Sequence, residues 1–289
     1  MAPSQAHLNI ENFAQLSHPA WQLVAVLLMV GYGAHLAFAP LFLVSSTQVA
    51  PRYRLGAWLG AVVMIAAGLS LYREYAAWQS AFVFVGDRWV PAADTVFSNA
   101  FRYANWTITI PLLIAQLLLA LNLPKSRMHS WFGILVVAAV AMIWLGLIGQ
   151  FYEHSSVGMM LIWGFLSTLP FVVLVRGVWR VLQEGRQHTP VALHPWLKNI
   201  FFYFLFFWGL YPIAYLLPVI GEGEVVIVLR QLLLTVADIF SKLVYGVILL
   251  RFTLRRSAFE GHRTSIEALS DLDGALAPFS NDFEERTPA

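Results

Sequence analysis

The sequence predicts an all-α protein, a bundle of seven membrane-spanning helices. Hydrophobic residues make up 59% of its 289 positions and charged residues only 12%, with a mean hydropathy of +0.67. This is more apolar surface than a soluble domain of this length buries. Seven separate apolar stretches are each long enough to cross a bilayer as a helix. Their approximate limits are 19–46, 54–80, 98–122, 129–152, 157–183, 196–218 and 226–254.

Polar segments flank this apolar region. Residues 1–18 lack a basic start followed by an apolar core, so they are not a cleavable signal peptide. We expect an extracellular segment there, in which Leu8, Phe13 and Leu16 form a short amphipathic cap. The seven-helix domain is assigned to residues 19–256. Residues 257–289 are rich in Ser, Asp, Glu, Gly and Pro, and we expect them to form a mostly disordered cytoplasmic tail.

The basic residues indicate the orientation. Twelve of the eighteen lie around the connections that follow the first, third and fifth spans or at the end of the seventh: Arg52, Arg54, Lys125, Arg127, Arg176, Arg180, Arg186, Lys198, Arg251, Arg255, Arg256 and Arg263. The opposite loops hold Asp87, Arg88, Asp94, Glu153, Glu222 and Glu224. The positive-inside rule therefore places the N-terminus outside and the C-terminus in the cytoplasm. Glu222 and Glu224 are expected to be solvated, and Arg73 and Glu74 to form an interfacial ion pair.

Several kinds of chemistry have no support in the sequence. The chain has no cysteine, which excludes disulfides and thiolate metal sites. Its eight histidines show no metal-binding spacing, and there is no glycine-rich phosphate loop. We therefore expect no metal, no nucleic-acid partner and no hydrolytic or transfer enzyme.

The seventh span carries two charges near its middle, Asp238 and Lys242. Four residues apart, they share one face of a helix. Ionisable residues at membrane depth are costly, face the protein interior and are usually functional. The pair is either a structural ion pair, or Lys242 is a buried amine that carries a cofactor as a Schiff base.

The third span carries a polar stripe. Asn105, Thr109 and Gln116 lie on one helix face, with Arg102 one turn nearer the outside. Any one of them could make an ordinary interhelical hydrogen bond. As a set, they point to a polar path through the bundle.

Four motifs in order resemble the microbial (type 1) rhodopsins over roughly residues 18–256. They are RYANWTITIPLL at 102–113, MIWLG followed by GQFYE at 142–153, WGLYP at 208–212 and DIFSK at 238–242. The resemblance implies all-trans retinal on Lys242 as a protonated Schiff base, with Asp238 as counterion. It also implies a retinal pocket formed by Trp106, Leu113, Met142, Gly146, Trp208, Tyr211 and Pro212, although any of these could be ordinary packing residues.

Two departures from the proton-pump pattern of that family are informative. Asn105 and Gln116 stand where proton pumps carry carboxylic acids. Asn cannot accept a proton near neutral pH and Gln cannot donate one. The Asn105-Thr109-Gln116 set is similar to that of the inward chloride-pumping bacterial rhodopsins. Sodium-pumping relatives carry Asp at the position of Thr109.

A charge count favours the same cargo. The Schiff base and Arg102 supply two positive charges and Asp238 one negative, so an anion would complete the balance. We expect chloride to be held by Asn105 and Thr109 and to move inward past Gln116.

Two other functions remain open, a sensory photoreceptor and a light-gated anion channel. The resemblance further implies a bacterial plasma membrane location and a homo-oligomer in the bilayer. Gly164 resembles a glycine that admits a carotenoid antenna in some relatives, although helix packing is the commoner reason for such a glycine.

Overall fold

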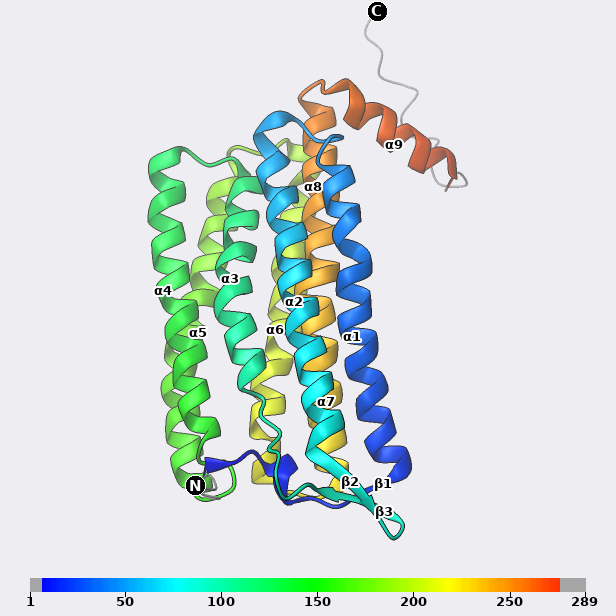
Figure 1. The fold of residues 1–289 in the computed structure, drawn as a ribbon. Coiled ribbons are helices and arrows are strands. Elements are labelled where there is room, and N and C mark those ends of the chain that lie inside the picture. The colour runs from blue at the N-terminus through cyan, green and yellow to red at the C-terminus, as the bar shows by residue number, and fades with distance from the viewer. Residues whose placement is uncertain (1–6, 276–289) are drawn as a thin grey trace, which may run out of the picture.

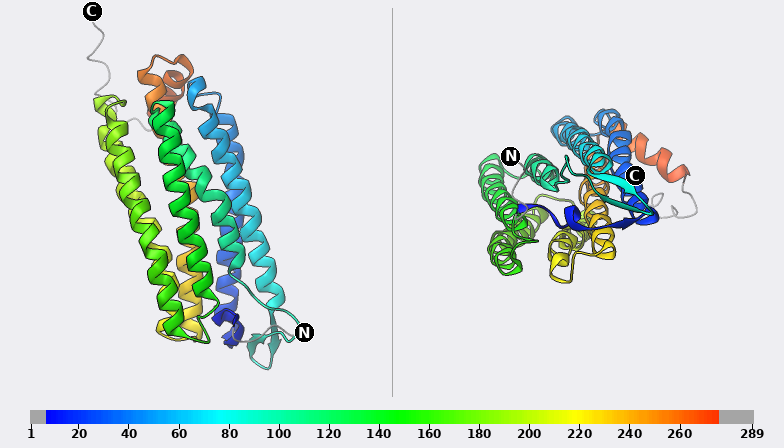
Figure 2. Two further views of the ribbon diagram at one scale, coloured as in Figure 1. Left: turned by 90° about the vertical axis from the view of Figure 1, so that its left-hand side faces the viewer. Right: turned by 60° about the horizontal axis from the view of Figure 1, so that its bottom comes forward.

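The computed structural model describes residues 7–275 and confirms the predicted fold class. Seven helical spans run side by side in one bundle (Figure 1). They are α1 (His18–Ser45), α2 (Arg54–Ala81, extended at its start by η3, Pro51–Tyr53), α3 (Ala100–Leu121), α4 (Lys125–Gln150), α5 (Val157–Arg186), α6 (His194–Leu216, preceded by η4, Val191–Leu193, and followed by η5, Leu217–Val219), and a seventh span made of α7 (Glu224–Asp238), η6 (Ile239–Val244) and α8 (Tyr245–Phe259). Each span packs against the next and α7 packs against α1, which closes a ring that Figure 2 shows obliquely in its right-hand view.

The predicted limits of the spans agree with the observed ones to within a few residues. Local chemistry explains several ends. Ser17 caps α1 with its hydroxyl, and Ser156 caps α5. Asn122 ends α3 in the left-handed conformation at φ 50°, which asparagine tolerates better than most residues. The fourth span begins four residues earlier than predicted, and the seventh continues to Phe259.

One end of the bundle, here called the hairpin end, carries a small sheet that the hydropathy pattern does not reveal. Strands β2 (Phe82–Val85) and β3 (Arg88–Pro91) form a hairpin, and β1 (Leu16–Ser17) pairs with the other edge of β3. A 3-10 turn, η2 (Ile10–Phe13), lies across the same end, where Ile10 and Leu16 are fully buried. Residues 8–17 thus form a partly buried cap joined to the sheet, more ordered than the surface helix we expected.

The opposite end of the bundle, here called the α9 end, differs from the prediction of a disordered tail. Residues 263–275 form a helix, α9 (Arg263–Ala275), and α8 itself extends past residue 257 (Figure 1). The helix is held because Ala268 and Leu269 pack against the core and the Ser265 hydroxyl donates to the Gln48 carbonyl oxygen at 2.5 Å. The prediction of a mostly disordered tail is therefore wrong for 257–275; residues 276–289 lie outside the described residues.

Tyr215 makes a tight contact between α4, α5 and α6. A Cβ on Gly149 would lie 1.9 Å from the Tyr215 hydroxyl oxygen, and a Cβ on Gly164 would lie 2.7 Å from its ring. Tyr215 is anchored because its hydroxyl donates to the Met160 carbonyl oxygen at 2.8 Å. Both glycines are therefore explained by the packing of one aromatic side chain.

Replacing Gly149 with alanine is expected to destabilise the fold by about 1–3 kcal/mol through overpacking. Gly158→Ala is the matched control, since a Cβ there meets no atom of the described chain within 4 Å. Thermal unfolding in detergent compares the two variants. Equal melting temperatures would contradict the packing role assigned to Tyr215.

Candidate functional site

Lys242 lies where the seventh span departs from α-helical geometry. The segment η6 forms a π-helical turn, a feature that occurs often at functional sites. The side chain is 1% exposed. Its ammonium group contacts the Asp238 carboxylate and lies 3.2 Å from the Tyr211 hydroxyl oxygen. The structure therefore brings together the lysine and the carboxylate that the sequence pairs.

Asp238 is surrounded by hydrogen-bond donors in the middle of the bundle. It is fully buried, and four side chains donate to it: Trp106 Nε1 and Tyr211 Oη at 2.9 Å each, Arg102 Nη1 at 2.6 Å, and Lys242 Nζ. Three of these donors come from α3 and α6. Such a donor set stabilises the ionised carboxylate and fixes its position.

Arg102 has a second carboxylate partner that sequence reasoning misplaced. Glu74 is fully buried on α2, and its Oε1 accepts from Arg102 Nε at 2.9 Å. Arg73, its expected partner, lies over the Phe101 ring instead. The predicted interfacial pair of Arg73 and Glu74 is therefore wrong, because the helix turns these neighbouring side chains in different directions.

This contact changes the charge count. Lys242 and Arg102 supply two positive charges, and Asp238 and Glu74 supply two negative ones. The formal sum of the four groups is zero, whereas the sequence-based count left one positive charge over. The prediction that Lys242, Arg102 and Asp238 leave a surplus positive charge for an anion to balance is therefore wrong, because Glu74 already balances that charge.

Asn105 stands directly before Trp106 on α3 and is 3% exposed. Neither its amide nitrogen nor its amide oxygen has a hydrogen-bond partner among residues 7–275. An unpaired amide in a protein interior is costly, so such a group is a strong candidate for contact with a bound ion or water. Thr109 differs, because its hydroxyl already donates to the Asn105 carbonyl oxygen at 2.8 Å.

Gln116 lies further along α3 toward the α9 end and is 3% exposed. Its amide nitrogen donates to the Gly56 carbonyl oxygen at 3.0 Å. Its Oε1 is buried, and no partner for it is found in the described part of the chain. The polar stripe predicted from the sequence is thus buried along its length.

A cavity of about 320 Å³ lies beside the Lys242–Asp238 pair, between α3, α4, α5 and α6. Of the seven predicted pocket residues, Trp106, Met142, Gly146, Trp208, Tyr211 and Pro212 line it. Leu113 is buried in the core but does not line the cavity. The volume of the cavity falls in the range of small-molecule sites, and the walls of the cavity are mainly apolar and aromatic.

The cavity reaches the surface between α5 and α6. Phe165 and Leu161 line it and are 66% and 41% exposed. Gly164 also lines it, next to the Tyr215 ring. The opening would face lipid in a membrane.

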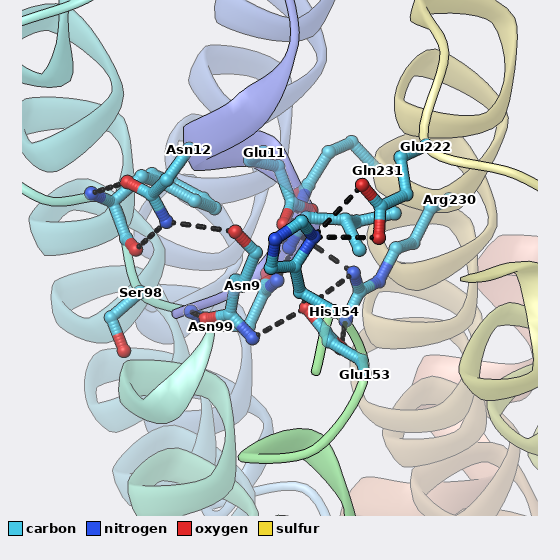
Figure 3. A network of polar contacts seen from close by, with 12 residues as sticks. Asn9, Glu11, Asn12, Ser98, Asn99, Glu153, His154, Glu222, Arg230 and Gln231 are labelled. Carbon is cyan, nitrogen blue, oxygen red and sulfur yellow. Dashed lines mark hydrogen bonds and ion pairs between the residues drawn. The ribbon is translucent and has the colours of Figure 1, made fainter. Parts of the chain in front are cut away.

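A second buried polar network lies at the hairpin end (Figure 3). Arg230 Nη2 donates to Glu153 at 2.7 Å, and Arg230 Nη1 lies 3.4 Å from Glu11. Asn9 and the Ile10 amide also donate to Glu153, each at 2.8 Å. These contacts fasten the N-terminal cap to α7 and to the loop after α4.

Gln231 links this network to the central cluster. It donates to Glu11 at 2.8 Å and to Asn99 at 3.0 Å, and its Oε1 accepts from Arg102 at 3.0 Å. Sequence reasoning treated Glu153 as a loop charge and overlooked Glu11. The available signal was Arg230, an arginine inside an apolar run, which needs a buried partner. Glu222 and Glu224 are also engaged, with His154 and with Ser17.

Breaking this network from one side should be costly. Glu153→Gln is expected to lower the free energy of unfolding by roughly 1–3 kcal/mol, because Arg230 keeps Glu11 as a carboxylate partner while the new amide NH2 group cannot accept the hydrogen bond from Arg230. Glu267→Gln, which breaks the solvent-exposed pair with Arg263, is the control and should change stability very little. Chemical denaturation monitored by tryptophan fluorescence measures both. A stable Glu153→Gln protein would contradict a structural role for the network.

No group of three or more His, Asp or Glu side chains suited to a metal ion occurs within residues 7–275.

Comparisons with known proteins agree with this architecture. The family model described as "Bacteriorhodopsin-like protein" matches residues 22–255. A green-light absorbing proteorhodopsin of Gamma-proteobacterium EBAC31A08 is 24% identical over 181 residues, which is 61% of this chain and 69% of that protein. A bacteriorhodopsin-II-like protein of Haloquadratum walsbyi (strain DSM 16790 / HBSQ001) is 31% identical over 153 residues, covering 52% of this chain and 59% of the relative.

Solved structures give the same result. Xanthorhodopsin, described as a light-driven ion pump with dual chromophore, superposes with a TM-score of 0.79 and 31% identity, covering 86% of this chain and 98% of that one. A thermophilic rhodopsin superposes with a TM-score of 0.80 and 30% identity, covering 86% and 99%.

Proposed function

Because the chain belongs to the family of bacteriorhodopsin-like proteins, we propose that it is a light-driven pump that binds retinal on Lys242 and carries chloride into the cell. The similar xanthorhodopsin is described as a light-driven ion pump. A buried lysine, an adjacent carboxylate and an apolar cavity support the same kind of function for this chain. The proposal separates into the cofactor, the cargo and the direction.

The residues present fit retinal. The cavity is mainly apolar and aromatic, and it lies near Lys242, because Tyr211 both lines it and lies within hydrogen-bond distance of the lysine nitrogen. Retinal bound there supplies the absorption of visible light and a light-driven change of shape. Asp238 balances the positive charge at the end of Lys242, and Trp106 and Tyr211 hold Asp238 in position.

The cargo is argued from Asn105. Its buried amide, unpartnered among the described residues, is the single observation that carries the proposal. An amide N–H can donate to chloride, and asparagine cannot accept a proton as the acid of a proton pump does. Thr109 would have to release its bond to the Asn105 carbonyl oxygen before its hydroxyl could join the site.

The direction follows from the expected orientation. By the positive-inside rule, the basic residues at the α9 end favour a cytoplasmic position for that end, and Gln116 lies between Asn105 and that end. An ion that leaves Asn105 along the polar stripe of α3 therefore moves inward. Gln116 replaces the proton donor of a proton pump and offers the ion a polar, uncharged contact.

A carotenoid antenna is a further proposal for the cofactor content. Xanthorhodopsin is described as having two chromophores, and the cavity of this chain opens to the surface beside Gly164. Against it, Tyr215 packs on Gly164 and accounts for that glycine without a second pigment.

The absorption spectrum tests the anion site. Retinal-bound protein is transferred from sodium sulfate to sodium chloride at constant ionic strength. A saturable shift of the visible band is expected, because an anion beside Asn105 changes the field at Lys242. An unchanged spectrum at every chloride concentration would argue for the sensory alternative, which needs no ion at this position.

A further inference from the structure

We propose that Glu74 takes up a proton when an anion binds beside Asn105, so that the charge of Glu74 sets the anion affinity of the site. This inference rests on the proposed chloride function and adds to it a proton-coupled residue on α2.

The charges in the interior of the bundle require such a partner. Lys242, Arg102, Asp238 and Glu74 sum to zero when all are ionised. A bound anion would leave one uncompensated negative charge in the interior, which is costly. The network at the hairpin end cannot compensate, because Arg230 already faces both Glu11 and Glu153. A proton is the smallest ion that restores the balance.

Hydrogen bonding distinguishes Glu74 from the other buried carboxylates. Asp238 accepts from four side chains. Glu153 accepts from Arg230, Asn9 and the Ile10 amide, and Glu11 from Asn99, Gln231 and Arg230. Glu74 accepts one bond, from Arg102, and its buried Oε2 has no partner within the described ranges. The ionised form of Glu74 is thus the least stabilised of the four.

Several charged or titratable side chains surround Glu74. The charged or titratable groups contributed by elements near this part of α2 are Arg102 on α3, Asp238 on α7, Lys242 in η6, Glu11 in η2, and Tyr32 and His35 on α1. Arg102 connects Glu74 with Asp238 directly, since it donates to both. A change of charge at Glu74 therefore alters the electrostatic field at Asp238 and Lys242, because Arg102 connects Glu74 with Asp238.

Linkage gives the expected behaviour. If binding of chloride brings in one proton, the midpoint of the chloride titration rises by up to about tenfold for each pH unit over which Glu74 is ionised in the anion-free protein. Glu74→Gln removes the negative charge permanently. Its chloride midpoint should be at least about tenfold lower than that of the wild type at high pH, and it should not change with pH.

The test uses the full-length retinal protein and two readouts. The visible band is titrated with sodium chloride against sulfate at several pH values, in the wild type and in Glu74→Gln. Separately, chloride is added to each protein in weakly buffered solution in the dark, and the proton uptake is measured with a pH electrode. Glu74→Asp keeps an acid at the position, and Glu222→Gln removes an outer carboxyl that pairs with His154.

The proposal expects proton uptake and a pH-dependent midpoint in the wild type, Glu74→Asp and Glu222→Gln, and neither in Glu74→Gln. A wild-type midpoint that is independent of pH overturns it, as does a Glu74→Gln protein that still takes up protons. If chloride shifts neither spectrum, the anion site itself is refuted. That result is distinguishable from a failure of Glu74 alone, in which both proteins respond to chloride identically.

Discussion

Lys242→Ala is expected to yield a folded protein that forms no visible pigment with retinal. A Schiff base needs a primary amine, and the remaining lysines, Lys125 and Lys198, lie at the α9 end of the bundle, far along their helices from the cavity. Folding should survive, because Asp238 keeps its bonds from Arg102, Trp106 and Tyr211. The absorption spectrum after addition of all-trans retinal measures the outcome.

Lys198→Ala is the matched control for this experiment. Lys198 lies over the Phe202 ring on the outside of α6 and is not among the residues that line the cavity. It should form pigment to the same extent as the wild type. A coloured Lys242→Ala protein, or a colourless Lys198→Ala protein that is folded, would contradict the assignment of the attachment site.

Asn105→Asp is expected to abolish chloride binding at neutral pH. The substitution places a carboxylate at the proposed anion site, and two unit charges about 4 Å apart repel by about 4 kcal/mol at an effective dielectric constant of 20. This corresponds to a loss of roughly a thousandfold in affinity. The chloride-induced shift of the visible band should disappear over any practical concentration range.

Asn122→Asp provides the control, since it makes the same chemical change at the end of α3 on the exposed surface. Its chloride titration should match that of the wild type. An unaltered chloride shift in Asn105→Asp would move the anion to another part of the protein and remove the main support for Asn105.

The sequence was sufficient to predict the seven spans and the pairing of Asp238 with Lys242. Both follow from strong local signals, long apolar runs and a four-residue spacing on a helix. The π-helical turn around Lys242 leaves no such signal. The sheet at the hairpin end was also missed, because β1 is only two residues long and pairs with a strand more than seventy positions away.

The partner of Arg102 could not be predicted for a different reason. Arg73 and Glu74 are adjacent, and the hydropathy pattern cannot tell which of them faces the bundle. The direction in which each of these two side chains leaves α2 decides the charge balance around Lys242. With Glu74 inside, the four charged groups there sum to zero, and without it the other three sum to one positive charge. That single contact invalidated the charge argument for chloride. The Asn105 amide, which has no hydrogen-bond partner within residues 7–275, supports the same cargo on other grounds.

The most direct test of the proposed function is the light-induced pH change of a weakly buffered suspension of cells that express the protein with retinal. The cells are compared in chloride and in sulfate, each with and without a protonophore. Inward chloride pumping predicts alkalinisation in chloride only, enhanced by the protonophore, because protons then follow the anion passively. Acidification that the protonophore abolishes would show an outward proton pump and contradict the roles proposed for Asn105 and Gln116.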